Sequence, residues 1–171
     1  MPLQIIFCVE TNKRADTDSI YISETIKHWY YLDNKTHISK IYMNSKSRYN
    51  SKDVLREIHK MTLSFSIGKT QVIYCIDTDQ YEKNANHAKE LEGISLFCKE
   101  HNYDLIWFCH NVEEVFLGKC VSDSQKVRAA ASFRRKNEIR NIHIDTLTLD
   151  SFHVHSSNLM SILDKYLPRK E

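Results

Sequence analysis

Residues 70–80 constrain the fold most, because an apolar run there stops abruptly at two carboxylates, Asp77 and Asp79. The run is rich in β-branched and aromatic residues, which predicts a strand buried on both faces of a parallel sheet. Both carboxylates then lie at its carboxyl end, where open α/β sheets bind ligands. Residues two apart point the same way, so the pair can hold Mg²⁺ or Mn²⁺. Ordinary turn chemistry is the alternative explanation.

Strand patterns alternate with amphipathic helix patterns along the chain. The other strands are expected at residues 3–9, 36–43 and 103–109. The helices between the strands are expected to begin at Thr17 or Asp18, at Ser51 or Asp53, and at Ala85. Such alternation predicts parallel pairing with right-handed crossovers. We therefore expect one α/β domain over residues 1–171, with a mainly parallel sheet of about four to five strands and helices on both faces.

Further expectations concern the ends of individual elements and the place of one strand in the sheet. Gly68 is expected to end the second helix, since glycine commonly follows a helix C-terminus. A basic helix is predicted over residues 122–140, and a final helix is predicted to be capped by Ser156 or Ser157. The strand at 36–43 is less continuously apolar than the others, which predicts a place near the sheet edge.

Composition narrows the class of protein. The chain has 171 residues, 42% hydrophobic and 27% charged, which is typical of one globular domain. No apolar run is long enough to cross a bilayer and no signal peptide is evident, so a cytoplasmic protein without membrane contact is expected. Four of the five cysteines lie in apolar runs and no C-x-x-C pair occurs, which argues against a structural zinc site. The net charge of +2 does not by itself indicate nucleic-acid binding.

Other acidic residues also follow predicted strands. Glu10 follows the strand at 3–9, and Glu113 and Glu114 come shortly after the strand at 103–109. A parallel sheet gathers these residues at one edge, where a divalent cation is the usual reason to tolerate their repulsion. A cation held there can activate water and stabilise a phosphoryl transition state.

The order of these motifs resembles the Toprim family of magnesium-dependent phosphodiester enzymes, most closely its small RloB-like and defence-island nucleases. Residues 9–13 are similar to the family's E-x-x-K after the first strand, and residues 76–79 to its D-x-D. Residues 111–117 are similar to a segment in which an acidic residue opens an apolar, aromatic helix, and residues 156–159 to the start of its last helix. The family often has N-P-x-F-E before the late glutamate, whereas this chain lacks that proline.

The resemblance implies roles for individual residues. Glu10 would be a general acid/base or a metal ligand, and Asp77 and Asp79 would be metal ligands. Lys13 would neutralise the scissile phosphate, although a solvated loop lysine explains it equally well. Glu114 would be a further ligand or helper, and its spacing to Phe116 and Leu117 favours it over Glu113.

Two classes of function follow. The first is a Mg²⁺- or Mn²⁺-dependent endonuclease acting on RNA such as tRNA, or on DNA, as a phage-defence or toxin-type effector. The second is a non-catalytic Toprim-like module that binds a nucleotide or a partner protein. A receiver-like or flavodoxin-like domain fits less well, because the arrangement of Glu10 and Lys13 does not follow that class.

Phosphate contacts are expected from the basic side chains Lys13, Arg14, Arg128 and Arg135. Arg128 and Arg135 share one face of the predicted basic helix, but a solvated helix surface explains them as well. His110 lies beside the acidic residues and can transfer protons, although a structural role is more common for such a histidine. His153 and His155 are expected to be a surface pair. A regulatory partner protein and a homo-oligomer are both compatible with the sequence.

Overall fold

Four parallel strands form the centre of the computed structural model, which describes residues 1–171. The sheet order is β2-β1-β3-β4, and all three neighbouring pairs are parallel. The strands are β1 (Leu3–Val9), β2 (Thr36–Tyr42), β3 (Lys69–Asp77) and β4 (Asp104–Phe108). The predicted α/β class is confirmed, and the strand at 36–42 is an edge strand as expected.

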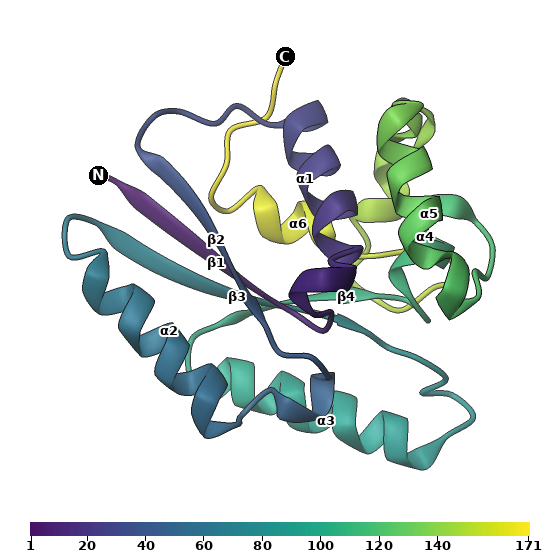
Figure 1. Cartoon of the computed structure of the whole chain (residues 1–171), viewed down its shortest axis with the longest axis horizontal. Helices are drawn as coiled ribbons and strands as arrows, with labels where there is room; N and C mark the ends of the chain where they lie inside the picture. The colour runs from purple at the N-terminus through teal and green to yellow at the C-terminus, as the bar shows by residue number, and fades with distance from the viewer.

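Helices cover both faces of the sheet, as Figure 1 shows. Helices α2 and α3 lie on one face, and α1, α4, α5 and α6 lie on the other. The helices are α1 (Asp18–Trp29), α2 (Lys52–Ser64), α3 (Ala85–Glu100), α4 (Val112–Leu117), α5 (Asp123–Arg135) and α6 (Leu159–Leu163). Short 3₁₀ turns are η1 (Lys13–Ala15), η2 (Lys46–Arg48), η3 (Glu138–Asn141) and η4 (Ile144–Leu147). No helix is both long and apolar enough to span a bilayer.

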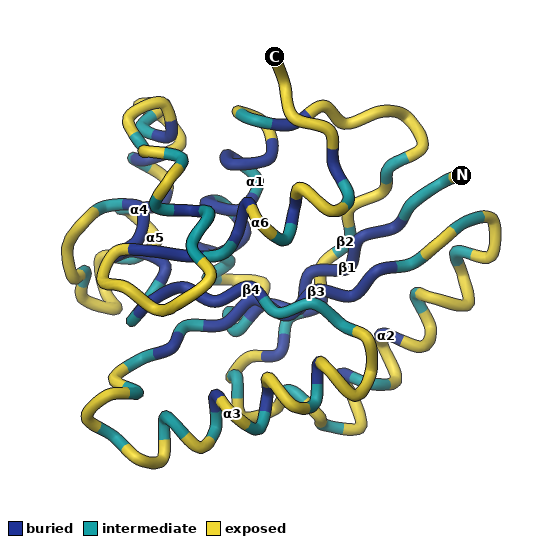
Figure 2. The backbone as a smooth tube through the Cα atoms, turned by 180° about the vertical axis from the view of Figure 1, so that it is seen from behind, coloured by how far each residue is buried: buried dark blue, intermediate teal, exposed yellow.

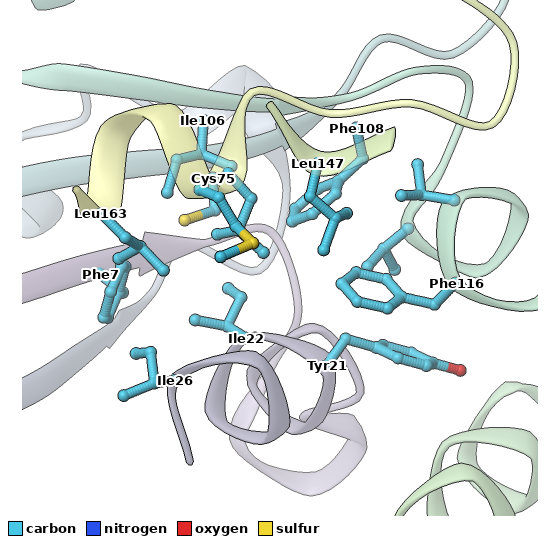
Figure 3. Close-up of a cluster of buried hydrophobic side chains, with 14 of the residues drawn as sticks. Phe7, Tyr21, Ile22, Ile26, Cys75, Ile106, Phe108, Phe116, Leu147 and Leu163 are labelled. Carbon is cyan, nitrogen blue, oxygen red and sulfur yellow. The ribbon is translucent and has the colours of Figure 1, made fainter. Parts of the chain in front are cut away.

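The central strands separate two hydrophobic cores. Successive residues of a strand face opposite sides, so Phe7 packs in the larger core beneath α1 and α6, and Cys8 packs in the smaller core beneath α2 and α3. Figure 3 shows part of the larger core, where Phe7 and Ile22 lie among side chains from the strands and helices. Burial of this kind is concentrated in the strands, while the outer helix surfaces are exposed (Figure 2).

Gly68 is required for close backbone packing and not for ending a helix. Helix α2 ends at Ser64, well before this glycine. A Cβ at residue 68 would lie 2.1 Å from the carbonyl oxygen of Pro2, so only glycine fits this close approach of two backbones. The expectation that Gly68 ends the helix is therefore wrong.

The basic helix is shorter than predicted. Helix α5 ends at Arg135, and Asn137 adopts a left-handed conformation (φ 53°), which stops the helix before Arg140. Asparagine tolerates this conformation better than most residues, so it interrupts a helix without a glycine. A separate 3₁₀ turn, η3, then carries the chain onward.

The last helix begins at Leu159 with Asn158 as its N-cap residue and spans only five residues, so the prediction of Ser156 or Ser157 as the N-cap is wrong. The hydroxyl of Ser157 accepts a hydrogen bond from the backbone N–H of Leu159 at 3.1 Å. Asn158 donates to the carbonyl of Leu105 and accepts from the N–H of Trp107, both at 2.9 Å. The Asn158 amide thus forms hydrogen bonds with backbone groups at the free edge of β4, where a further strand would otherwise pair.

Candidate active site

Glu10 and Asp77 lie side by side at the carboxyl edge of the sheet. Glu10 directly follows β1, and its Oε2 accepts a hydrogen bond from the backbone N–H of Asp77 at 3.2 Å. Asp77 is the last residue of β3, and its Oδ1 accepts from the N–H of Val112, the first residue of α4, at 3.1 Å. The two carboxylates are therefore held between the strand ends and the start of α4.

Two further carboxylates face this pair. Asp18 comes from the first turn of α1 and is 5% exposed, and Glu113 comes from α4 and is 1% exposed. Both carboxylate oxygens of Glu113 are buried without a hydrogen-bond partner. We refer to Glu10, Asp18, Asp77 and Glu113 as the acidic cluster. The sequence marked Asp18 only as a possible helix cap, because no pattern signals where its side chain lies.

Burial and mutual repulsion raise the pKa values of three members of the acidic cluster, Glu10, Asp18 and Asp77. Burial and the nearby charge of Asp18 raise the pKa of Glu10 to about 8. Burial and the charge of Glu113 raise the pKa of Asp18 to about 7. Burial and the charge of Glu10 raise the pKa of Asp77 well above its usual range. Near neutral pH the cluster therefore holds protons, or it holds a cation that replaces them.

A lysine holds Asp79, the other member of the D-x-D pair. Lys46 forms an ion pair with Oδ2 of Asp79 and also donates to the backbone carbonyl of Asp77 at 2.9 Å. Asp79 has a left-handed backbone (φ 50°), which turns the chain away from the strand direction. Lys46 lies in the polar segment after β2, and no pattern in that segment predicts its contact with Asp79.

A second lysine approaches the cluster from α5. The Nζ atom of Lys126 lies 3.7 Å from Oε2 of Glu113 and 3.5 Å from Oδ1 of Asp123. Lys126 belongs to the helix that the sequence predicts to be basic. Its position shows that part of this helix balances the acidic cluster rather than facing solvent.

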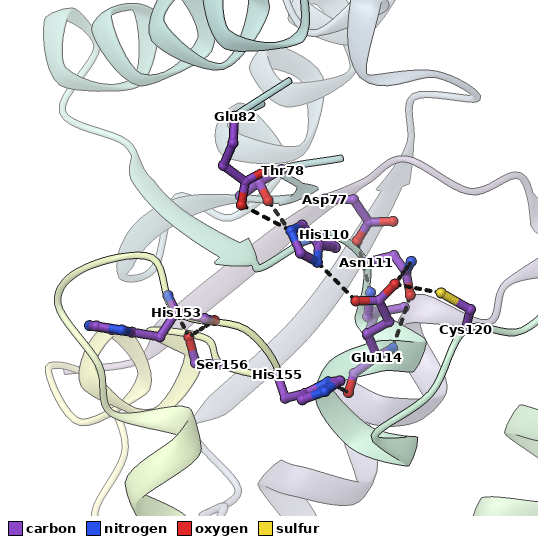
Figure 4. A network of polar contacts seen from close by, with 11 residues as sticks. Asp77, Thr78, Glu82, His110, Asn111, Glu114, Cys120, His153, His155 and Ser156 are labelled. Atoms are coloured by element: carbon purple, nitrogen blue, oxygen red, sulfur yellow. Dashed lines mark hydrogen bonds and ion pairs between the residues drawn. The ribbon is translucent and has the colours of Figure 1, made fainter. Parts of the chain in front are cut away.

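Glu114 contacts His110, Asn111 and Cys120 in a separate network, as Figure 4 shows. Its Oε2 lies 3.0 Å from Nδ1 of His110, and its Oε1 accepts from the thiol of Cys120 at 2.8 Å. Burial opposes ionisation, but the hydrogen bonds from Cys120 and His110 lower the pKa of Glu114. The geometry therefore places Glu113 in the cluster, whereas the spacing had favoured Glu114.

His110 is held from three sides. Its Nε2 lies 3.0 Å from Oε1 of Glu82, its Nδ1 contacts Glu114, and its backbone N–H donates to Oγ1 of Thr78 at 2.8 Å. The hydrogen bonds to Glu82 and Glu114 raise its pKa. His153 and His155 are both exposed, as expected of a surface pair, and Nδ1 of His155 also lies 3.0 Å from the carbonyl oxygen of Glu114.

The cations predicted to contact phosphate are exposed and form no ion pair. Lys13 and Arg14 lie in η1, shortly after Glu10. Arg128 and Arg135 lie on the outer surface of α5. None of the four is tied to a carboxylate of this chain, so all are available to an external anion.

The acidic cluster is more spread out than the ligands of a bound ion. No three of its carboxylates offer oxygens that all lie within 4.8 Å of one another, which like-charge repulsion and the two lysines explain. Comparisons with family models, curated proteins and solved structures give no match for this chain. Fold and site define an all-parallel α/β domain that carries an acidic cluster at its carboxyl edge.

We expect the cation-free protein to lose thermal stability as the pH rises from about 5 to about 8. Unfolded carboxyl groups titrate near pH ~4, whereas Glu10 and Asp18 keep their protons up to pKa values of about 8 and about 7 in the fold. In this window the folded state binds more protons, so the free energy of unfolding falls as pH rises. The raised pKa of His110 acts in the same direction.

Melting temperatures measured by calorimetry in the presence of a chelator check this expectation. The Glu10→Gln variant should flatten the dependence, because it removes one of the responsible carboxyl groups. Groups with lowered pKa values, such as Asp16 and Asp164, lose their stabilising contribution only at more acidic pH. A melting temperature that rises steadily from pH 5 to 8 would contradict the acidic cluster.

Proposed function

We propose that this domain is a divalent-cation-dependent nuclease, a Toprim-like phosphodiesterase that cleaves RNA, such as tRNA, or DNA. The observation that carries the proposal is the acidic cluster, in which four carboxylates from three separate parts of the chain meet at the ligand-binding edge of a parallel sheet. A cluster maintained only for packing would be costly, since burying like charges destabilises a fold.

The donor chemistry of the cluster fits a hard cation. Every donor is a carboxylate oxygen, which suits Mg²⁺ or Mn²⁺, and the two oxygens of Glu113 have no hydrogen-bond partner, with the Lys126 ammonium 3.7 Å from one of them. Glu10, Asp77 and Glu113 would hold the ion, and Asp79 would join them where Lys46 releases it. The cation supplies charge stabilisation for a phosphoryl transition state and lowers the pKa of water.

The residues of this chain have separate tasks in such a reaction. Glu10 keeps a proton near neutral pH, which suits a general acid or base. Lys46 positions the end of β3 through Asp79 and the Asp77 carbonyl. His110 contacts Oε1 of Glu82 through Nε2 at 3.0 Å, and it lines an open cavity together with Asp79.

Substrate contacts are assigned to exposed cations. Lys13 and Arg14 follow Glu10 directly, so they can bind a phosphate beside the cluster. Arg128 and Arg135 extend this contact along α5, as cations without partners in the chain. The resemblance to RloB-like proteins supports a cytoplasmic defence effector, acting with a regulatory partner or as a homo-oligomer.

A cleavage assay tests the proposal. The purified chain is incubated with end-labelled RNA and single-stranded DNA at one salt concentration, with Mg²⁺, with Mn²⁺ or with excess chelator. We expect cleavage only where a cation is present, with RNA preferred. A non-catalytic module that binds a nucleotide is the second candidate, and it predicts cation and nucleotide binding without any cleavage product.

A further inference from the structure

Three side chains of different chemistry meet beside the acidic cluster. One ligand atom from each of Glu82, Cys109 and His110 lies within 4.8 Å of the other two, and no other group of three has this property. Glu82 lies in the loop after β3, and the other two residues follow β4. The group shares no residue with the acidic cluster, so it is a separate feature of the same sheet edge.

The donor set differs from that of the acidic cluster. It combines a thiol sulfur, an imidazole nitrogen and a carboxylate oxygen, which together suit zinc rather than magnesium. The sequence argued against zinc because it lacks a C-x-x-C pair. That argument does not apply here, because Glu82 is brought to Cys109 and His110 only by the pairing of β3 with β4.

The orientation of His110 is the second observation. Its Nδ1 is taken by Oε2 of Glu114 at 3.0 Å, which leaves Nε2 facing Glu82. Glu114 is itself held by Cys120 at 2.8 Å and by Asn111 at 3.4 Å, as Figure 4 shows. A carboxylate that fixes the far nitrogen of a histidine is the usual support of a metal-bound imidazole.

The backbone of His110 also supports a built site. It is left-handed (φ 61°), a conformation that is uncommon for histidine, and its N–H is held by Oγ1 of Thr78 at 2.8 Å. Strained positions of this kind concentrate at functional sites. This backbone conformation places the His110 ring beside Glu82. The preceding residue, Cys109, is fully buried.

An open space adjoins two of the three donors, Glu82 and His110, while Cys109 lies buried behind them. A cavity of about 790 Å³ is lined by Glu82, His110 and Glu114 together with His87 and Cys120. Nδ1 of His87 is buried without a hydrogen-bond partner. Three protein donors beside an open space are the arrangement of a zinc ion that keeps one position for water or a ligand.

We propose that Glu82, Cys109 and His110 form a zinc site, with Glu114 orienting His110. Binding displaces the proton of the Cys109 thiol and the proton between His110 and Glu82, so the ion replaces the 3.0 Å hydrogen bond of the metal-free protein. Zinc affinity should therefore rise with pH.

Cobalt(II) is the probe, because a cysteine thiolate bound to cobalt gives a charge-transfer absorption band. We expect this band in the wild-type chain, its loss when Zn²⁺ is added, and its absence in Cys109→Ser. Glu114→Gln should keep the band but weaken the affinity by about 10- to 100-fold, as for other residues that support a ligand. Glu82→Gln should weaken cobalt binding without affecting folding, because its side chain is 41% exposed.

Matched variants separate this site from its neighbours. Cys98→Ser changes another buried thiol, in the core beneath α2 and α3, and should keep the band. Asp77→Asn alters the acidic cluster and should keep it as well. No thiolate band in the wild type, or an unchanged band in Cys109→Ser, would overturn the zinc site. If Cys109→Ser does not fold, unchanged cobalt affinity in Glu82→Gln would do the same.

Discussion

Asp77→Asn is expected to lower cation-dependent cleavage by about 1,000-fold or more, since a bound cation contributes several kcal/mol to the transition state. The amide keeps the shape of the side chain, and its oxygen can still accept the hydrogen bond from the N–H of Val112. What is lost is the charge that holds the cation. The measurement is the cleavage rate at saturating Mg²⁺ or Mn²⁺, compared with the wild type.

The same substitution should not unfold the protein. Asp77 repels Glu10, Asp18 and Glu113, so removing its charge relieves repulsion, and the cation-free melting temperature should be unchanged or higher. Asp145→Asn is a suitable control, because Asp145 is exposed, forms no ion pair and should leave cleavage unchanged. Wild-type cleavage by Asp77→Asn would exclude the acidic cluster as the catalytic site, whereas cation binding without cleavage by the wild type would leave the binding module.

Glu113→Gln and Glu114→Gln are expected to differ, although the two residues are adjacent. Glu113 belongs to the acidic cluster and its oxygens have no hydrogen-bond partner, so its loss should lower cleavage by about 100-fold or more. Glu114 faces His110 and Cys120 instead, and its loss should reduce cleavage by less than about tenfold if it supports a neighbouring side chain only.

The two variants control for one another, because they make the same chemical change at neighbouring positions of α4. Cation-free melting adds a second measurement. Glu113→Gln should be as stable as the wild type or more stable, since it removes one buried charge from the cluster. Glu114→Gln should be less stable, because it weakens the contacts to His110 and Cys120. The opposite order of activities would make Glu114 the functional acid, as its spacing predicts.

Hydropathy patterns along the chain are enough to predict the α/β class and the place of two acidic residues. Continuous apolar runs predict β1 and β3 as buried strands, and parallel pairing makes every strand end at the same edge. Glu10 and Asp77 therefore had to lie close together. Ser51, whose side chain accepts from the N–H of Val54, was likewise visible as a helix cap.

Contacts between distant elements determine which other side chains lie beside Glu10 and Asp77. Asp18, Lys46 and Lys126 come from elements whose patterns report burial and periodicity, but not the direction of a single polar side chain. The choice between Glu113 and Glu114 is of the same kind, because one step along a helix turns a side chain by about 100°. The sequence sets the pattern of each element, and contacts between distant elements set the chemistry at the edge where they meet.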